Sequence, residues 1–426
     1  MGRLSRAELQ ERNRARVLAA AEGEFADSGF RDAKVDRIAE RAGLTRGAVY
    51  SNFPGKRGLY FAVLAERAER TERAPAAPRP EPGRTLGEAL GALARAWVAR
   101  LPLADTDEQH GAARLGVYVV PEVLAEERIR RPYAQLMKLD ALLLGLALER
   151  LGSAPVSGAG AGAGSGATST GGSLVRVAEA VLTVLHGASQ LAAAAPGFVE
   201  PFNVVRACGQ LAGLVLQERY APTHVITRAL PADEPWSPPQ GAVDAVRDAP
   251  ARLGGDGVVA VLGLHRIESV EDAVRAARPG TSVTAVLVTG SPDELAPLAR
   301  LAVADLCGCL RRAFPTAAWP RLQVVVDPSG VVAAAAGVPA VSEETEVAIR
   351  VEAGRIVSRA DGRGACHAAA GGAVLTDDQG AREVGVQDSR VQETRVQDSR
   401  VQKTLIQDAG AKDAGAQETR VMGGSL

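Results

Sequence analysis

Aromatic residues are scarce in this chain: Phe, Trp and Tyr together make up 4% of its 426 residues, whereas hydrophobic residues make up 46%. The cores must therefore be built mainly from alanine, leucine and valine, and an alanine-rich composition suits closely packed helices. The length is sufficient for two or three domains of ordinary size.

Cysteine is scarce as well, with four residues in the whole chain: Cys208, Cys307, Cys309 and Cys366. These cysteines form neither a CxxC pair nor a spaced set of ligands, so the sequence predicts no disulfide scaffold, no zinc site and no other cofactor. The net charge is only −1, so the overall composition by itself does not favour a nucleic-acid partner.

Long apolar segments are also missing. The first sixteen residues carry charges throughout and contain no apolar signal core. No later stretch was expected to reach the length and apolarity of a membrane span. These absences predict a cytoplasmic protein with no membrane partner.

The stretch Lys34–Phe53, KVDRIAERAGLTRGAVYSNF, contains the strongest local pattern. Gly43 suits a tight turn, and Thr45 can cap a second short helix that ends near Asn52. The first half of the stretch places apolar residues on one helical face: Val35, Ile38, Ala39 and Ala42. Two short helices joined in this way are typical of a helix-turn-helix.

The second helix of this unit carries small and polar side chains, which allow close approach to base edges in a major groove. Residues 34–60 hold six basic and two acidic side chains, so this region is positive in a nearly neutral chain. A solvated helical surface would show the same charges. The motif and the charge together favour DNA binding.

Residues 11–71 resemble the DNA-binding domain of the TetR/AcrR family of bacterial transcriptional regulators. The resemblance is carried by the segment GFRDAKVDRIAERAGLTRGAVYSNFPGKRGLYFAVL. The resemblance implies a homodimer that reads a palindromic operator. The sequence departs from the family pattern at Ala33–Lys34, where the family usually has a Thr that caps the first helix of the motif. We expect Asp32 to substitute for this cap. The candidate DNA-binding residues are Lys34, Thr45, Arg46, Gly47, Ala48, Tyr50, Ser51, Asn52 and Lys56.

A helical effector-binding and dimerisation domain is expected over residues 84–220, after a Pro-rich break at 74–83. Thr85 and Glu88 form a capping-box pattern, and further helices are expected over about 121–151, 174–195 and 201–219. The resemblance implies that the last two of these helices form a four-helix dimer interface, although core helices of a monomer would show the same pattern. An unknown small-molecule effector would bind among these helices, and the candidate ligand-binding residues, which could equally be ordinary core residues, are Trp97, Tyr118, Tyr133, Met137 and His186.

The region 221–257 is Pro-rich and reads as a linker. Apolar runs at 258–264, 283–289 and 322–327 then alternate with helical segments at 270–277 and 293–313, and a hairpin is expected over 347–359. This order resembles a thioredoxin-like fold of the redoxin branch over residues 257–370, carried by segments such as VLVTGSPDELAPLARLA and VVVDPSGVVAAAAGVPAV.

Redox chemistry does not follow from this resemblance, because a reactive thiolate is expected at a helix start. Ser291 and Pro292 occupy that place, whereas Cys307 and Cys309 fall near the end of the same helix. The sequence therefore predicts inert cysteines and no enzyme. The alternatives are a redox-sensing regulator and a thiol oxidoreductase that uses the C-terminal domain.

From Val386 the chain repeats every five residues, and residues 371–426 are predicted to form a low-complexity, disordered tail. The fold class is therefore multidomain. An all-α N-terminal helix-turn-helix and a helical regulatory domain are followed by an α/β thioredoxin-like domain and the tail. The predicted function is a ligand-responsive repressor that binds double-stranded DNA as a homodimer and has no cofactor.

Overall fold

The computed structural model describes residues 5–73, 81–101, 115–153, 173–216 and 227–371. The predicted repeat tail, except for Gly371, lies outside the described residues, as do 154–172 of the low-complexity segment and 74–80 of the Pro-rich break. The described residues belong to one compact unit, which spans residues 1–373.

The described residues begin with four helices: α1 (Arg6–Asp32), α2 (Val35–Ala42), α3 (Arg46–Asn52) and α4 (Lys56–Arg73). The two short helices predicted on either side of Gly43 are present as α2 and α3. Gly29 breaks the helical backbone inside α1 with a φ of 71°. A cluster of aromatic rings packs between α1 and α4, since the ring of Tyr60 lies 5.4 Å from that of Phe25 and 4.8 Å from that of Phe30. This cluster holds α1 against α4.

A second set of helices follows. It comprises α5 (Leu86–Val98), the 3₁₀ helix η1 (Leu115–Tyr118), α7 (Val119–Ala125), α8 (Glu127–Gly152), α9 (Val175–Ala194) and α10 (Pro201–Leu211). The predicted capping box is present, because Thr85 accepts from the amide of Glu88 and Glu88 accepts from the amide of Thr85. Two predicted bounds were wrong. The helix expected over 121–151 is interrupted by extended backbone at Glu126, and the last helix ends at Leu211 instead of continuing to 219.

The expectation that no stretch reaches the length and apolarity of a membrane span was also wrong. Among the described residues, helix α9 is long and apolar enough to cross a membrane, judged by its length and composition alone. The core helix of a water-exposed protein can pass the same test. One face of α9 is buried in the fold, through residues such as Val177, Val181 and Leu185, so α9 is weak evidence for a membrane span.

The C-terminal part contains a mixed sheet with the strand order β1-β8-β7-β4-β5-β6. Its strands are β1 (Leu230–Pro235), β4 (Gly257–Gly263), β5 (Ser282–Val288), β6 (Gln323–Val326), β7 (Glu346–Glu352) and β8 (Arg355–Asp361). β4, β5 and β6 run parallel, whereas β7, β8 and β1 are joined antiparallel. The accompanying helices are α11 (Ser269–Ala276), α12 (Pro292–Ala313), α13 (Val331–Ala335) and α14 (Ala365–Gly371). All five predicted strands and both predicted helices of this region are present.

The Pro-rich segment 221–257 was predicted to be a linker, and its described part is instead folded. β1 pairs with β8 at the edge of the sheet, and a two-stranded ladder joins β2 (Val243–Asp244) to β3 (Ala249–Pro250). Buried Trp236 donates from Nε1 to the carbonyl of Leu253 at 2.6 Å. An edge strand tolerates proline because one side of it needs no ladder hydrogen bonds. The Pro-rich composition of this segment therefore did not distinguish an edge strand from a linker.

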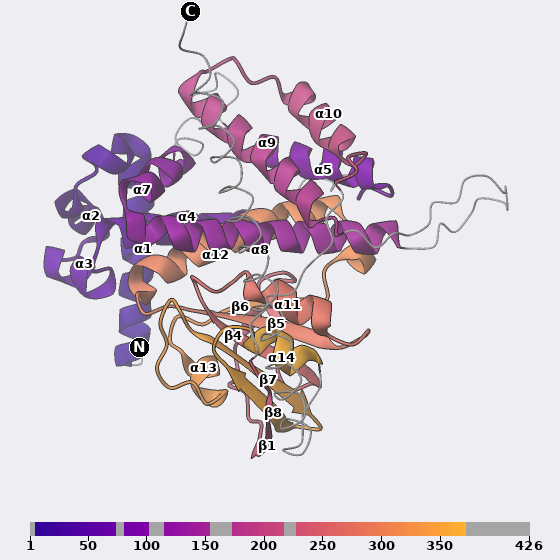
Figure 1. The fold of residues 1–426 in the computed structure, drawn as a ribbon. Helices are drawn as coiled ribbons and strands as arrows, with labels where there is room; N and C mark the ends of the chain where they lie inside the picture. The colour runs from indigo at the N-terminus through magenta and orange to yellow at the C-terminus, as the bar shows by residue number, and fades with distance from the viewer. Residues whose placement is uncertain (1–4, 74–80, 102–114, 154–172, 217–226, 372–426) are drawn as a thin grey trace, which may run out of the picture. The chain divides into compact units, whose positions relative to one another are not determined.

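Helix α12 belongs to the sheet region in sequence, yet it packs along α4, α5 and α8 (Figure 1). Ion pairs between described residues fasten it there: Arg57–Glu294 at 3.0 Å, Glu69–Arg300 at 2.8 Å, Arg100–Asp305 at 3.0 Å and Arg128–Glu294 at 2.9 Å. The first two pairs end on α4, the helix that directly follows the helix-turn-helix unit. The sheet region is therefore fastened through α12 to the helical layer.

Replacing Gly58 by Ala is expected to lower the free energy of unfolding by about 1–3 kcal/mol, because α4 and α12 approach too closely for a methyl group. A Cβ at Gly58 would lie 2.4 Å from the backbone oxygen of Asp293, whereas a Cβ at Gly47 would meet nothing nearer than Thr45 Oγ1 at 3.9 Å. Gly47→Ala, also in the first turn of a helix, is the matched control. Urea unfolding of both variants measures the effect, and equal midpoints would mean that the two helices can move apart freely.

Candidate functional site

The recognition-helix candidate α3 is held by one buried side chain and one cap. Val49 is 1% exposed and anchors the helix, while the Oγ1 atom of Thr45 accepts from the amide of Ala48 at 3.2 Å. Gly43 adopts the left-handed conformation that the turn needs, with φ 59°. Most of the predicted DNA-binding residues are exposed on this unit: Lys34, Thr45, Arg46, Gly47, Tyr50 and Ser51 are exposed, and Ala48, Asn52 and Lys56 are partly buried.

The first motif helix is positioned by a residue that the sequence did not single out. The side chain of Lys34, at the cap position of α2, makes no capping bond. Glu24 of α1 is fully buried and accepts from the amide of Lys34 at 3.3 Å, and its other oxygen lies 3.5 Å from Nε of Arg41. The expectation that Asp32 replaces the missing Thr is therefore corrected to Glu24, which is ten residues away in sequence and so gave no local capping pattern.

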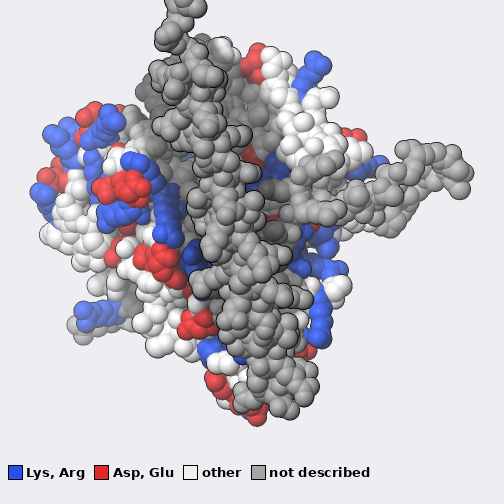
Figure 2. Space-filling model, in the orientation of Figure 1, with Lys and Arg blue, Asp and Glu red and all other residues white. Residues whose placement is uncertain are grey.

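Two of the three long basic side chains among the candidates, Arg46 and Lys56, already have local partners. Arg46 lies 3.3 Å from Asp36 and over the ring of Tyr50, and its hydrogen bond with Tyr50 and the charge of Asp36 raise its pKa. Lys56 donates from Nζ to the carbonyl of Arg31 at 2.9 Å, and burial lowers its pKa. Figure 2 shows Lys and Arg gathered over the N-terminal helices with Asp and Glu among them. Binding to phosphates would exchange these local contacts for new ones.

Two polar side chains at the end of α3 are bonded to their own helix. Ser51 donates from Oγ, and Asn52 from Nδ2, to the carbonyl of Ala48 at 2.9 and 2.8 Å. Arg14 of α1 lies over the ring of Phe53, with its guanidinium carbon 4.4 Å from the ring centroid. The contact of Arg14 with Phe53 joins the end of α3 to α1, whereas the bonds of Ser51 and Asn52 stay within α3.

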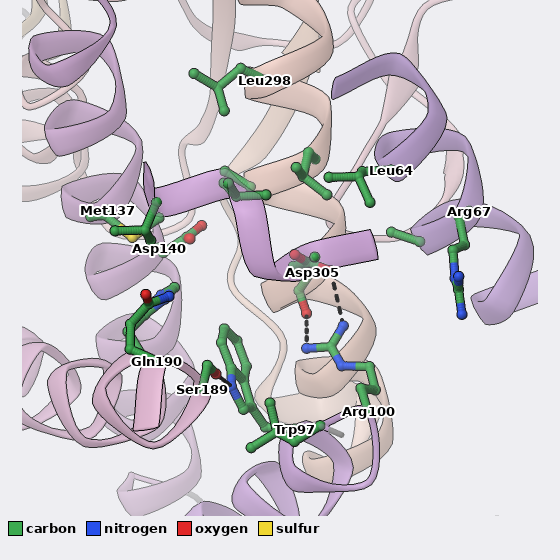
Figure 3. Close-up of a pocket in the computed structure, with 18 of the residues that line it drawn as sticks. Leu64, Arg67, Trp97, Arg100, Met137, Asp140, Ser189, Gln190, Leu298 and Asp305 are labelled. Atoms are coloured by element: carbon green, nitrogen blue, oxygen red, sulfur yellow. Dashed lines mark hydrogen bonds and ion pairs between the residues drawn. The ribbon is translucent and has the colours of Figure 1, made fainter. Parts of the chain in front are cut away.

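A cavity of about 440 Å³ lies among α4, α5, α8, α9 and α12 (Figure 3). Of the predicted ligand-binding residues, Trp97, Tyr133, Met137 and His186 line it. Tyr118 belongs to η1, and its side chain is not among those described. Gln190, one turn from His186 and considered with it for a ligand role, lines the cavity too. Residues that the sequence did not propose also line it: Leu64, Arg67, Ala68 and Thr71 from α4, Arg100, Asp140 and Ser189, and Leu298, Leu301, Ala302 and Asp305 from α12.

The polar groups of this cavity differ in how they are partnered. Trp97 donates from Nε1 to Ser189 at 2.9 Å, and Arg100 donates to Asp305 at 3.0 Å. Burial raises the pKa of Asp140 well above its usual value, and the nearby Asp305 carboxylate raises it further. Burial also lowers the pKa of His186 to about 4, with a smaller contribution from Arg100. At neutral pH the imidazole of His186 is therefore neutral, and burial disfavours the charged form of the Asp140 carboxyl group.

The four cysteines are buried and unoxidised. Burial raises the pKa of Cys307 and Cys366, and it raises the pKa of Cys208 to about 11. A thiol with a raised pKa is a poor nucleophile at neutral pH. Among the described residues no group of three or more His, Cys, Asp or Glu side chains could hold a metal ion.

The geometry of α2, the Gly43 turn and α3 defines a helix-turn-helix DNA-binding domain. Residues 17–63 match the family model described as bacterial regulatory proteins, tetR family. The N-terminal domain of this chain is therefore a TetR-family helix-turn-helix, as its sequence predicted.

The similar proteins share mainly this domain. SrpR, an HTH-type transcriptional regulator of Pseudomonas putida, is 48% identical over 67 residues, which are 16% of this chain and 31% of that protein. FasR, an HTH-type transcriptional activator of Mycolicibacterium smegmatis, is 37% identical over 60 residues, 14% of this chain and 27% of that protein. The chain thus spans less than a third of the length of these two relatives.

A TetR transcriptional regulator from Rhodococcus sp. RHA1, solved by crystallography, matches 49% of this chain and 99% of its own, with 17% identity and a TM-score of 0.30. The regulator homologues support a DNA-binding regulator.

Proposed function

We propose that this protein is a ligand-responsive transcriptional repressor that binds a palindromic operator as a homodimer in the cytoplasm. The observation that carries the proposal is the position of α4. This helix begins four residues after α3 ends, and four of its residues line the cavity: Leu64, Arg67, Ala68 and Thr71. A molecule in the cavity therefore touches the helix that carries the DNA-binding unit.

In this proposal the effector changes the position of α4, and with it the separation of the two recognition helices in the dimer. An operator with fixed half-site spacing would then fit only one helix at a time, and its affinity would fall. α12, which also lines the cavity, is joined to α4 by the ion pairs of Arg57 with Glu294 and of Glu69 with Arg300. A shift of α4 must therefore displace or carry α12.

The proposed dimer interface is an exposed apolar surface around α9 and α10. Its large side chains have exposed fractions that are unusual for a monomer surface: Leu191 44%, Phe198 71%, Phe202 77%, Leu214 41%, Val215 82% and Leu216 41%. We infer that these side chains together form one apolar surface, and exposed apolar surface of this kind marks an interaction site. In the proposed dimer, a second copy of the chain buries this surface and also supplies the second recognition helix that a palindromic operator needs.

We further propose that residues 257–370 have a thioredoxin-like fold. In this proposal the region forms part of the cavity wall and supports the helical layer, and it does not act as an enzyme. The buried cysteines, with their raised pKa values, give no support to the redox-sensing regulator or the thiol oxidoreductase.

The experiment that tests the proposed function is the recovery of genomic DNA bound by the full chain, followed by gel shifts on the recovered sites. The expected result is an inverted repeat whose half-sites lie about one helical turn apart, and a dimer bound to it. Sites without inverted symmetry, or a monomer on the DNA, would contradict the proposal. Release of the DNA by a compound linked to the neighbouring genes would establish the response to a ligand.

Replacing Lys56 by Ala is expected to weaken binding to every DNA sequence to a similar extent and to reduce the slope of log affinity against log salt by about one unit, because one phosphate contact is lost. The Nζ atom of Lys56 is already held beside the carbonyl of Arg31, at the edge of the unit. Anisotropy titrations at several salt concentrations measure both quantities. If only the specific operator were affected, Lys56 would instead contact a base.

A further inference from the structure

Two polar side chains in the wall of the cavity have no hydrogen-bond partner among the described residues for one of their atoms. Asp140 is 3% exposed and its Oδ1 atom is unpartnered, and the buried Nε2 atom of His186 is unpartnered as well. Both residues line the cavity, Asp140 from α8 and His186 from α9. Buried polar groups are normally paired, because an unpaired one costs stability. Two such groups in one cavity indicate a ligand that supplies the missing hydrogen bonds.

The charges near these two groups are compensated. The guanidinium of Arg100 donates to the Oδ1 atom of Asp305 at 3.0 Å and to its backbone oxygen at 3.3 Å, and it lies over the ring of Trp97. Figure 3 shows this pair beside Trp97, with the hydrogen bonds dashed. Arg100 and Asp305 already neutralise each other. A charged ligand group beside Asp140 would therefore lose its hydration without gaining an opposite charge from this pair, which is costly.

Arg67 is the other cation of the cavity wall. Its side chain extends away from Asp140 and Gln190 in Figure 3, on the α4 side. Burial lowers its pKa, and the charge of Glu22 on α1 acts in the opposite direction. Arg67 therefore lies on the α4 side of the cavity, apart from Asp140.

The remaining wall is mostly apolar. Met137, Leu298 and Leu301 contribute aliphatic surface, and the imidazole of His186 meets the Trp97 ring edge to face at 5.0 Å between centroids. Aromatic and aliphatic surfaces of this kind favour an apolar ligand body.

Resting on the proposed function, we propose that the cavity takes a compact, uncharged organic molecule with an apolar body and a hydroxyl or carbonyl group that bonds to Asp140 and His186. The Oδ1 atom of Asp140 offers one hydrogen bond to such a group, and the Nε2 atom of His186 offers the second. The apolar body lies against α12, so the sheet region forms part of the binding site.

Three probes of matched size test the ligand class: 4-phenylbutan-1-ol, 4-phenylbutanoate and 4-phenylbutylammonium. Titration calorimetry with the full chain is expected to show that the alcohol binds about tenfold more tightly than either ion, because neither ion finds a free counter-charge beside Asp140. The proposal is wrong if an ion binds as tightly as the alcohol or if no probe binds. Tight binding of the carboxylate that disappears in Arg67→Gln would assign the site to anions instead.

Variants of the two polar residues test their roles. Asp140→Leu is expected to weaken binding of the alcohol about threefold to tenfold, the equivalent of one hydrogen bond, whereas Asp140→Asn keeps the affinity within about twofold because the amide can still bond. If Asp140→Leu does not fold, His186→Phe serves the same purpose, since it preserves the ring and removes Nε2. Unchanged affinity in the folded variant overturns the assignment.

A gel shift in the presence of the alcohol separates this inference from the proposed function. If the alcohol binds and operator affinity stays the same, the ligand class stands and the proposed response to a ligand fails. If no probe binds while the operator is still bound as an inverted repeat, the DNA-binding part of the proposal stands and the ligand class is wrong.

Discussion

A chain that ends at residue 226 is expected to lose its cooperative thermal unfolding transition, because the cut removes α12 from the helical layer. α12 buries Leu298, Leu306 and Leu310, each at most 1% exposed. Burying one leucine contributes roughly 1.5–3 kcal/mol, and a whole domain is stable by only about 5–15 kcal/mol. Removing this helix with its ion pairs to α4 therefore removes free energy comparable to the total.

Circular dichroism during heating measures this effect, with a chain that ends at residue 373 as the length control. The control is expected to melt like the full chain, since the repeat tail was predicted to contribute no core. The variant Leu298→Ala should fall between the two, with a loss of about 2–5 kcal/mol. A cooperative transition in the chain cut at 226, close to that of the full chain, would show that α12 is dispensable for the helical layer.

Replacing Gly47 by Glu is expected to weaken operator binding at least about 100-fold, equivalent to about 2.7 kcal/mol, while the free protein remains as stable as before. Gly47 is exposed on α3, and a Cβ there would meet only Thr45 Oγ1 at 3.9 Å, so the free protein has room for the side chain. At the DNA surface the same side chain would bring bulk and a negative charge against phosphates and base edges.

Gly255→Glu is the matched control, since it makes the same charge change at an exposed glycine of the sheet region with no atom within 4 Å of the added Cβ. Anisotropy titrations on the recovered operator compare both variants with the unaltered chain. Affinities within about threefold of each other would mean that α3 does not enter the groove, and the assignment of the DNA-binding face would have to move to another element.

Local pattern predicted the elements well and their long-range packing poorly. The spacing of Val35, Ile38 and Ala42, the cap at Thr45 and the turn at Gly43 depend on neighbours in sequence, so α2 and α3 were predicted to within about a residue. The capping role of Glu24 depends on the fold of α1 over α2. Nothing near Lys34 in the sequence shows it.

The cavity was predicted only in part for the same reason. Aromatic and polar residues within the helical region pointed to Trp97, Tyr133, Met137 and His186, all of which line it. Asp140 was hidden inside a leucine-rich helix whose pattern suggested only a core. The part of the cavity wall that α12 forms could not be predicted from the sequence. A helix that covers a sheet needs the same apolar face, and no local sequence signal indicates that α12 also faces α4.

The position of Trp97 gives the protein an optical reporter of its own cavity. The other tryptophans are Trp236, which is bonded to the carbonyl of Leu253, and Trp319, which is bonded to that of Phe314, so both belong to the sheet region. With these two replaced by Phe, emission from the indole of Trp97 would come from the cavity wall alone. Its intensity and wavelength would follow the polarity around His186 and Arg100 as a small molecule enters, without any dye or label.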